Sequence, residues 1–301
     1  MDWIDTGASP PMATGPTRTC RVRRLAFMPL VSETARSFVD SSWEPDLSTA
    51  TRRFTSRCVL LAPFLLSAGC LKPNEPSPPR DGIWQSTILG RSIENRPIEL
   101  LTAGNGPDVV FIMATIHGNE WAGTPIVNRL AEYIAANPAM LEGRRVLLMP
   151  VANPDGYAKK IRHNVRGVDL NRNFPADNYQ TSDRHGNSAL SEPESRVLHE
   201  LLLKHRPARI VSIHQPLVCI DYDGPAEALA RAMGRYSELP VKKLGGRPGS
   251  LGSFAGESLG IPIITLELPP NEERLSPDAL WTRHGRMMVA AITFPQSPPG
   301  E

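Results

Sequence analysis

The sequence predicts a single α/β domain with a central, mostly parallel or mixed sheet flanked by helices on both faces. Between residues 98 and 292, short apolar segments alternate with longer amphipathic ones. The apolar segments are continuous rather than alternating, as in strands that are buried on both faces of a sheet. Two of these segments end in a histidine, which places polar chemistry at one edge of the sheet.

The predicted strands and helices follow one another in regular order. Each strand is a run rich in Val, Ile and Leu, and Ser191 with Glu194 forms a capping-box pattern at the start of the second helix. Strands are expected over residues 98–102, 109–116, 145–151, 209–214 and 261–268, and helices over residues 121–136, 192–205, 226–236 and 277–292. Cys219, between two apolar residues, is expected to be a buried and inert thiol.

Composition limits the function classes. The chain of 301 residues is 41% hydrophobic and 21% charged, which is typical of a soluble globular protein. The balance of 33 basic to 31 acidic residues gives no electrostatic reason to expect nucleic acid as a partner. Prolines are densest in the first 80 residues and the last ten, which hold 13 of the 30, so the folded domain is expected over residues 81–296, followed by a disordered tail at 297–301.

The segments before this domain resemble an export signal and a tether. Residues 1–50 show no period and are expected to be disordered, or to lie upstream of the true start codon. Residues 51–70 combine a basic start, a short apolar run and small residues before Cys70, which resembles the lipobox of a bacterial lipoprotein. Residues 71–80 form a proline-rich linker. We therefore expect an exported protein, periplasmic or membrane-anchored through a lipid on Cys70, with a cytoplasmic location as the alternative.

Two potential metal ligands follow the strand at 109–116. His117 and Glu120 are three residues apart, with the next helix beginning directly after Glu120. Both side chains can therefore lie above the carboxyl edge of the sheet, where open α/β sheets bind ligands. This tetrapeptide has low specificity when it stands alone.

A third ligand ends another strand. His214 closes the apolar segment 209–214, and parallel strands that end in histidine bring both imidazoles to the same edge. Two histidines and one glutamate form an open zinc site with a position left for water. The remaining histidines stand in polar surroundings and are expected at the surface: His163, His185, His199, His205 and His284.

Glu267 is the only carboxylate of the strand at 261–268. A carboxylate in an apolar strand is costly to bury without a partner or a function. Near a zinc-bound water it could act as general base. A buried salt-bridge partner is the alternative.

The segment 167–175 carries a second group of polar side chains. Arg172 offers a planar fork that suits a carboxylate, and Asn171 adds a neutral donor. Asp169 could hold the free nitrogen of a zinc-bound histidine. Taken alone, the segment could also be a structural turn with a surface arginine.

Together these segments resemble the zinc carboxypeptidase family, the carboxypeptidase A-like metallopeptidases. The resemblance rests on His214 and on residues 117–120, 153–157, 162–164, 169–174 and 266–268, in the order of the family. It implies one Zn²⁺ per chain, bound by His117, Glu120 and His214. It further implies Glu267 as base and acid, Arg162 at the oxyanion, Asn171 and Arg172 at the substrate's terminal carboxylate, and Asp169 behind His117.

Within the family the sequence is most similar to the murein peptide amidase branch. Digestive carboxypeptidases carry an active-site tyrosine before the catalytic glutamate, whereas this chain has none between Tyr236 and Glu267. Residues 214–221 and 247–254 look like the amidase branch, whose members split the γ-D-glutamyl–meso-diaminopimelate bond. This resemblance implies a small murein-derived peptide as substrate, and Arg247 is our candidate for binding a second substrate charge.

Three alternatives remain open at this point. The chain could be a general metallocarboxypeptidase, or an N-deacylase similar to aspartoacylase or succinylglutamate desuccinylase. A non-catalytic murein-binding lipoprotein is disfavoured because every catalytic residue type is present. Zinc content and a chelator-sensitive assay would separate enzyme from binding protein.

Overall fold

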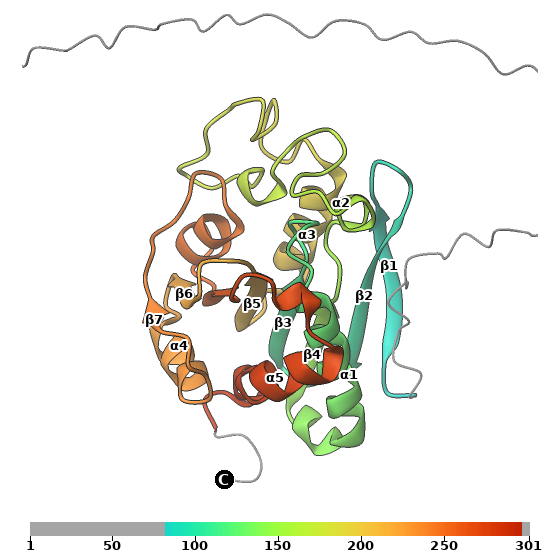
Figure 1. The fold of residues 1–301 in the computed structure, drawn as a ribbon, viewed down its shortest axis with the longest axis vertical. Coiled ribbons are helices and arrows are strands. Elements are labelled where there is room, and N and C mark those ends of the chain that lie inside the picture. Colours follow the sequence, from blue (N-terminus) through green and yellow to red (C-terminus); the bar gives the residue numbers. More distant parts are fainter. Residues whose placement is uncertain (1–81, 297–301) are drawn as a thin grey trace, which may run out of the picture. The chain divides into compact units, whose positions relative to one another are not determined.

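The computed structural model describes residues 82–296, which fold around an eight-stranded mixed sheet (Figure 1). The strand order is β1-β2-β4-β3-β5-β8-β6-β7. The strands are β1 (Gln85–Arg91), β2 (Pro97–Gly104), β3 (Asp108–Ala114), β4 (Arg144–Met149), β5 (Arg209–His214), β6 (Cys219–Asp223), β7 (Val241–Lys242) and β8 (Ile263–Glu267). The extension at 1–50, the signal at 51–70, the linker at 71–80 and the tail at 297–301 all lie outside the described residues.

Five α-helices and four shorter helical turns connect these strands within the described range. The α-helices are α1 (Gly123–Ala136), α2 (Pro154–Lys159), α3 (Pro193–His205), α4 (Glu227–Gly234) and α5 (Pro277–Thr293). The turns are the 3₁₀ segments η1 (Pro138–Leu141), η2 (Leu170–Arg172) and η4 (Glu272–Arg274), and the π-helical segment η3 (Ser253–Ser258). Among residues 82–296, no helix combines the length and the apolar character that crossing a membrane requires.

The sheet is parallel at its centre, is flanked by antiparallel pairs on both sides, and ends at one edge in the short parallel pair of β6 and β7. Strands β4, β3, β5 and β8 run in the same direction, whereas β2 pairs antiparallel with β4 and β6 pairs antiparallel with β8. The carboxyl ends of β3, β5 and β8 therefore meet at one edge. Strand β6 begins at that edge and runs away from it, since Cys219 is paired with Glu267.

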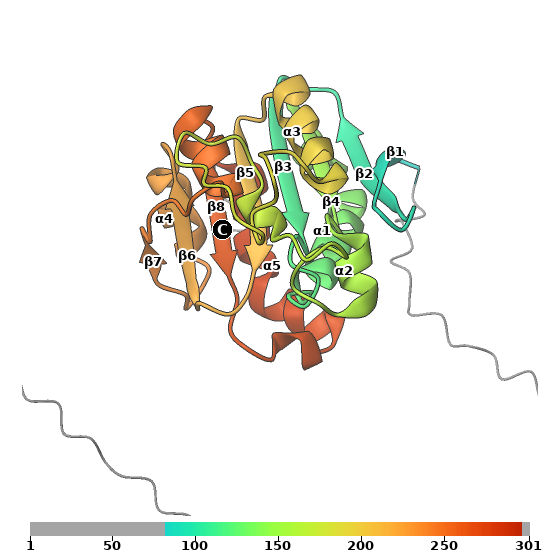
Figure 2. The same cartoon turned by 90° about the horizontal axis from the view of Figure 1, so that it is seen from above.

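Helices cover both faces of the sheet, as the sequence predicts. One core cluster packs α1, α4 and α5 against one face through residues such as Ile126, Leu229 and Met288. A second cluster packs α3 and η3 against the other face through Leu198 and Phe254. Figure 1 looks roughly along the central strands and shows helices on both sides of them, and Figure 2 shows α3 lying over the sheet.

The predicted elements are present, with ends that differ by at most two residues from those expected. The prediction missed the strands β1, β6 and β7 and the short helix α2. Strand β1 is an exposed edge strand without a buried face, and β6 carries two aspartates, so neither has the apolar run of a central strand.

The predicted capping box is wrong. Helix α3 begins at Pro193, whose fixed φ suits the first helical position, so Glu192 becomes the cap residue and makes no side-chain cap hydrogen bond. Ser191 instead donates to the Glu192 carboxylate at 2.9 Å. Glu194 is fully buried, and neither of its carboxylate oxygens has a hydrogen-bond partner among the described residues.

Candidate active site

The turn after β3 presents the first two candidate ligands. His117 and Glu120 are 3% and 6% exposed, and the Glu120 N–H donates to the His117 carbonyl oxygen at 3.1 Å, which closes the turn. Gly118 is required here because a Cβ on it would lie 1.9 Å from the carbonyl carbon of Gly156 in α2. Asn153, at the start of α2, donates to the Ile116 carbonyl oxygen and accepts from the Gly156 N–H. Two distant segments thus fix the ligand turn together.

The third candidate ligand lies at the end of the neighbouring strand. His214 is the last residue of β5, is 3% exposed, and is paired in register with Glu267 of β8. Strands β3 and β5 are adjacent and parallel. The topology therefore brings His214 beside the turn that holds His117, as the sequence predicts.

The three side chains converge on one point. The Nδ1 atom of His117 lies 2.9 Å from Glu120 Oε2, and the Nδ1 atom of His214 lies 3.1 Å from the same oxygen. The two Nδ1 atoms are 3.3 Å apart. The ligand atoms of all three residues lie within 4.8 Å of one another, which is a geometry that could hold a metal ion.

The Nε2 atom of each imidazole, which points away from Glu120, has a hydrogen-bond partner. Asp169 Oδ1 lies 3.0 Å from His117 Nε2, and Ser212 Oγ lies 3.0 Å from His214 Nε2. When each Nε2–H donates to its partner, both Nδ1 lone pairs face the Glu120 carboxylate. Three electron-rich groups in contact repel one another unless a cation lies between them, so the donor set fits a zinc ion.

Ser212 is a residue of the candidate site that the sequence reasoning missed. It lies two residues before His214 on β5, and alternation along a strand places both side chains on the same face. A serine at that spacing, in an otherwise apolar strand, is the signal that could have revealed it.

Arg162 forms hydrogen bonds with both Glu120, a candidate ligand, and Asp169, which contacts His117. Its Nη1 donates to Glu120 Oε1 at 2.6 Å and its Nε donates to Asp169 Oδ2 at 3.2 Å. Burial alone would raise the pKa of both carboxyl groups. When the two imidazoles are instead protonated at Nδ1, their hydrogen bonds to Glu120 hold the pKa of its carboxyl group well below the usual range. For Asp169 a hydrogen bond from His117, with the charges of His117 and Arg162, does the same.

Glu267 lies at the same edge, beside the three ligands. It is 8% exposed, and the Leu217 N–H donates to its Oε2 at 3.2 Å. No described cation forms an ion pair with Glu267, so the structure gives no support to a buried salt bridge. Its carboxylate lines the same cavity as His117 and His214.

That cavity has a volume of about 450 Å³ and carries all but one of the predicted site residues. Asn171 and Arg172 come from η2, and Arg247 comes from the loop before η3. The Asn171 Oδ1 accepts the Leu251 N–H at 2.9 Å, which leaves its amide nitrogen as the group to offer a ligand. Asp169 is the exception, since it stands behind His117. Predicted residues from six separate segments of the chain thus share one site.

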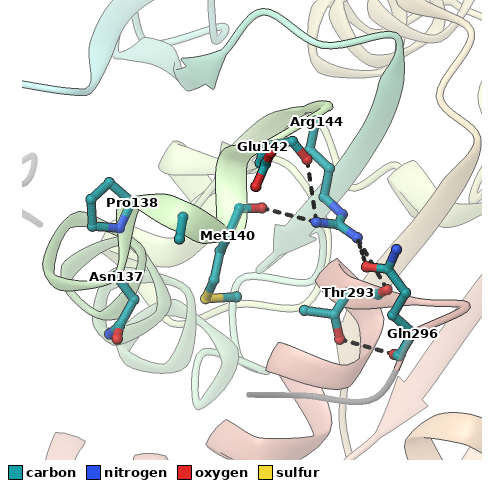
Figure 3. A pocket seen from close by; sticks show the side chains of 8 residues that line it. Asn137, Pro138, Met140, Glu142, Arg144, Thr293 and Gln296 are labelled. Carbon is teal, nitrogen blue, oxygen red and sulfur yellow. Dashed lines mark hydrogen bonds between the residues drawn. The ribbon is translucent and has the colours of Figure 1, made fainter.

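A second cavity, of about 490 Å³, lies at the opposite end of the strands and holds no comparable chemistry (Figure 3). Its one cation is Arg144, at the start of β4. The Arg144 guanidinium donates to the Met140 and Thr293 carbonyl oxygens and to the Gln296 side chain, and it forms an ion pair with Asp108. These bonds join α5 to the sheet, so this arginine has a structural role.

The prediction that the other histidines lie at the surface is wrong for His284. It is 2% exposed on α5, with Nε2 lying 2.7 Å from Glu272 Oε2. Helix α5 packs against the sheet along most of its length, and His284 falls on that buried side. Cys219 is fully buried as expected, and burial raises the pKa of its thiol.

The comparisons with known proteins agree with this geometry. A family model described as zinc carboxypeptidase matches residues 82–231. Murein peptide amidase A of Escherichia coli K12 is 32% identical over 211 residues, which cover 64% of this chain and 83% of that protein. The chain belongs to the zinc carboxypeptidase family.

Membership makes the chain a metallopeptidase-type hydrolase, as predicted, and the predicted similarity to murein peptide amidases is confirmed. The crystal structure of murein-tripeptide amidase from Escherichia coli O157 matches with a TM-score of 0.54 and 28% identity, covering 73% of this chain and 98% of that one. A gamma-D-glutamyl-L-diamino acid endopeptidase of Lysinibacillus sphaericus is 28% identical over 178 residues, which cover 43% of this chain and 45% of that protein.

Proposed function

We propose that this protein is a zinc-dependent amidase that hydrolyses the γ-D-glutamyl–meso-diaminopimelate bond of murein peptides. The observation that carries the proposal is one cavity that brings together three convergent potential metal ligands, the Glu267 carboxylate, and the side chains of Asn171 and Arg172, which suit a carboxylate. The names of the murein peptide amidase and diamino acid endopeptidase relatives support the choice of bond.

His117, Glu120 and His214 would hold one zinc ion. Zinc bound there would supply Lewis acidity and lower the pKa of a water molecule. Asp169 and Ser212 keep the two imidazoles in the tautomer that presents Nδ1.

Glu267 is the group placed to move protons. It takes a proton from the attacking water and returns it to the amine that leaves, so the same carboxylate serves as base and then as acid. Its anchor is the Leu217 N–H, which binds Oε2 and leaves Oε1 for this exchange.

The cationic side chains of the cavity have separate tasks. Arg162 stabilises the negative charge that develops on the carbonyl oxygen of the scissile bond. Asn171 and Arg172 bind the terminal carboxylate of the substrate, and Arg247 binds a second negative charge. Diaminopimelate carries a carboxylate at both ends, which gives each of these groups a partner.

Hydrolysis of L-Ala-γ-D-Glu-meso-diaminopimelate by the purified zinc-loaded protein tests the proposal. A peptide with an ordinary α-linked C-terminal residue and an N-acyl amino acid are the comparison substrates. We expect the murein tripeptide to have the highest kcat/KM. A preference for the ordinary peptide would assign a general metallocarboxypeptidase, and a preference for the acyl amino acid would assign an N-deacylase.

Variants test the roles of individual residues. Glu267→Gln should retain one zinc per chain by elemental analysis and lose about 10²- to 10⁴-fold in kcat. The exposed Glu238→Gln is the matched control and should behave as wild type. Wild-type turnover by Glu267→Gln would refute the role of Glu267, and wild-type turnover by Arg247→Ala would remove Arg247 from the site.

We further propose that the enzyme is exported and held at a membrane by a lipid on Cys70. The basic start, apolar run and small residues of segment 51–70 support this location. Incorporation of labelled palmitate that Cys70→Ser abolishes is the expected result. Recovery of the unlabelled protein in the cytoplasmic fraction would contradict it.

A further inference from the structure

The cavity extends beyond the catalytic groups to two aspartates that the proposed reaction does not use. Asp221 and Asp223 lie on β6 and line the same cavity as Glu267. Cys219 pairs with Glu267, Asp221 with Thr265 and Asp223 with Ile263. Because alternate residues share a face, both aspartates and Glu267 stand on the same face of the sheet.

The register gives the depth of each aspartate. A strand rises about 3.3 Å per residue, so Asp221 lies about 7 Å and Asp223 about 13 Å beyond the level of Glu267. In an extended diamino acid, about 7 Å separates the scissile amide nitrogen from the distal ammonium nitrogen. A distal ammonium would therefore reach the level of Asp221, with the Asp223 carboxylate directly below it.

Asp223 is a buried carboxylate that forms no ion pair within residues 82–296. It is 4% exposed, its Oδ1 has no hydrogen-bond partner among residues 82–296, and no described cation forms an ion pair with it. Gly252 packs against it so closely that a Cβ there would lie 2.1 Å from Asp223 Oδ2. An isolated buried carboxylate is costly, so it indicates that a positively charged group binds there.

The hydrogen bonds that Asp221 accepts from described residues fall on one of its two carboxylate oxygens. Its Oδ1 accepts the N–H groups of Tyr222 and Leu244 at 2.9 and 2.8 Å, which orients the carboxylate and leaves Oδ2 available. Burial raises the pKa of both Asp221 and Asp223. A bound cation would remove this penalty.

The opposite charge lies on another wall of the cavity. Arg247 lines it from the loop before η3, near enough to Asp221 for their charges to interact. The far end of the cavity thus offers negative and positive groups together. The distal centre of diaminopimelate carries an ammonium and a carboxylate, which match these two signs.

We propose that Asp221 and Asp223 bind the distal ammonium of a diamino acid on the leaving side of the scissile bond, and so select this substrate class. The inference rests on the proposed function, because it takes Glu267 as the reacting end of the cavity. It makes Asp221 and Asp223 specificity residues and not participants in bond cleavage.

A binding experiment in a Glu267→Gln background tests the inference without turnover. The full zinc-loaded chain is titrated by calorimetry with L-Ala-γ-D-Glu-X, where X is meso-diaminopimelate, lysine or norleucine. Lysine and norleucine have side chains of similar length, and only lysine carries the ammonium. We expect the lysine peptide to bind at least about tenfold more tightly than the norleucine peptide.

Asp223→Asn should remove this preference while leaving norleucine binding unchanged, and Asp221→Asn should reduce it independently. Glu238→Gln in the same background is the control and should keep the preference. The inference is overturned if lysine gives no advantage over norleucine, or if the advantage survives both aspartate substitutions. A chain that shows the aspartate-dependent preference but, with Glu267 intact, cleaves none of the peptides would refute the proposed function alone.

Discussion

Replacement of Asp223 by asparagine should stabilise the folded protein at neutral pH. Burial first, and then the charges of Asp221 and Glu257, raise the pKa of Asp223 from 3.8 to about 6. At about 1.4 kcal/mol for each pKa unit, the ionised carboxylate destabilises the fold by up to about 3 kcal/mol. Asparagine fills nearly the same volume and carries no charge, so Asp223→Asn should recover most of this free energy.

The sign of the pH dependence follows from the same pKa difference. Between pH 4 and 6 the folded chain holds the Asp223 proton more tightly than the unfolded chain does, so wild type loses stability as pH rises through this window. The Asp223→Asn variant has no carboxyl group at this position and so should not lose stability in this pH window for this reason. Its advantage should therefore be full at pH 7.5 and should shrink towards zero as the pH falls to about 4.

Urea unfolding of the zinc-loaded chain, followed by circular dichroism at several pH values, measures this difference. In thermal unfolding of a domain of this size, a stabilisation of 3 kcal/mol would raise Tm by about 6–12 °C. Glu238→Gln, which removes an exposed carboxylate, should leave stability unchanged at every pH. Equal stability of Asp223→Asn and wild type at pH 7.5 would show that the buried charge is already compensated and would refute the reasoning.

Three further outcomes are expected from the metal site and its supporting turn. Asp169→Asn and Ser212→Ala should each lower zinc affinity by about 10- to 100-fold in competition with a chelator, because each releases one imidazole from its fixed tautomer, and unchanged affinity would contradict that role. Zinc affinity of the wild type should fall as pH decreases, since metal and protons compete for the same nitrogens, and a titration showing no such fall would exclude the histidine ligands. Gly118→Ala should lose zinc and stability because its Cβ would collide with Gly156, whereas Gly82→Ala, with no atom within 4 Å, should lose neither by elemental analysis and thermal unfolding.

The sequence predicted those parts of the fold and site that depend on contiguous patterns. The central strands are apolar runs, and His117, His214 and Glu267 are polar residues at the ends of such runs, so their meeting at one edge follows from parallel topology. Zinc coordination by these residues stays a prediction, although their geometry suits it.

Contacts between segments distant in sequence were harder to predict. Asp221 and Asp223 break the apolar pattern of β6, so the strand that forms a wall of the cavity resembles a loop. His284 is buried where α5 packs against the sheet, and the carboxylate that it contacts there lies twelve residues away, in η4. The sequence shows that Ser212 and His214 lie two residues apart on β5 and so share a face. It does not show that the hydroxyl group contacts the imidazole.

The reversal of β6 relative to β8 separates two properties of the enzyme. In the proposed function, the residues that would activate water cluster where the parallel strands end. Strand β6 starts there and leads away, so each second residue along it would meet the substrate further from the scissile bond. Specificity can then drift by substitutions along a single short strand while the hydrolytic groups stay untouched. An acidic residue moved up or down this strand would retune the length of side chain accepted, which offers a direct route to redesigned amidases.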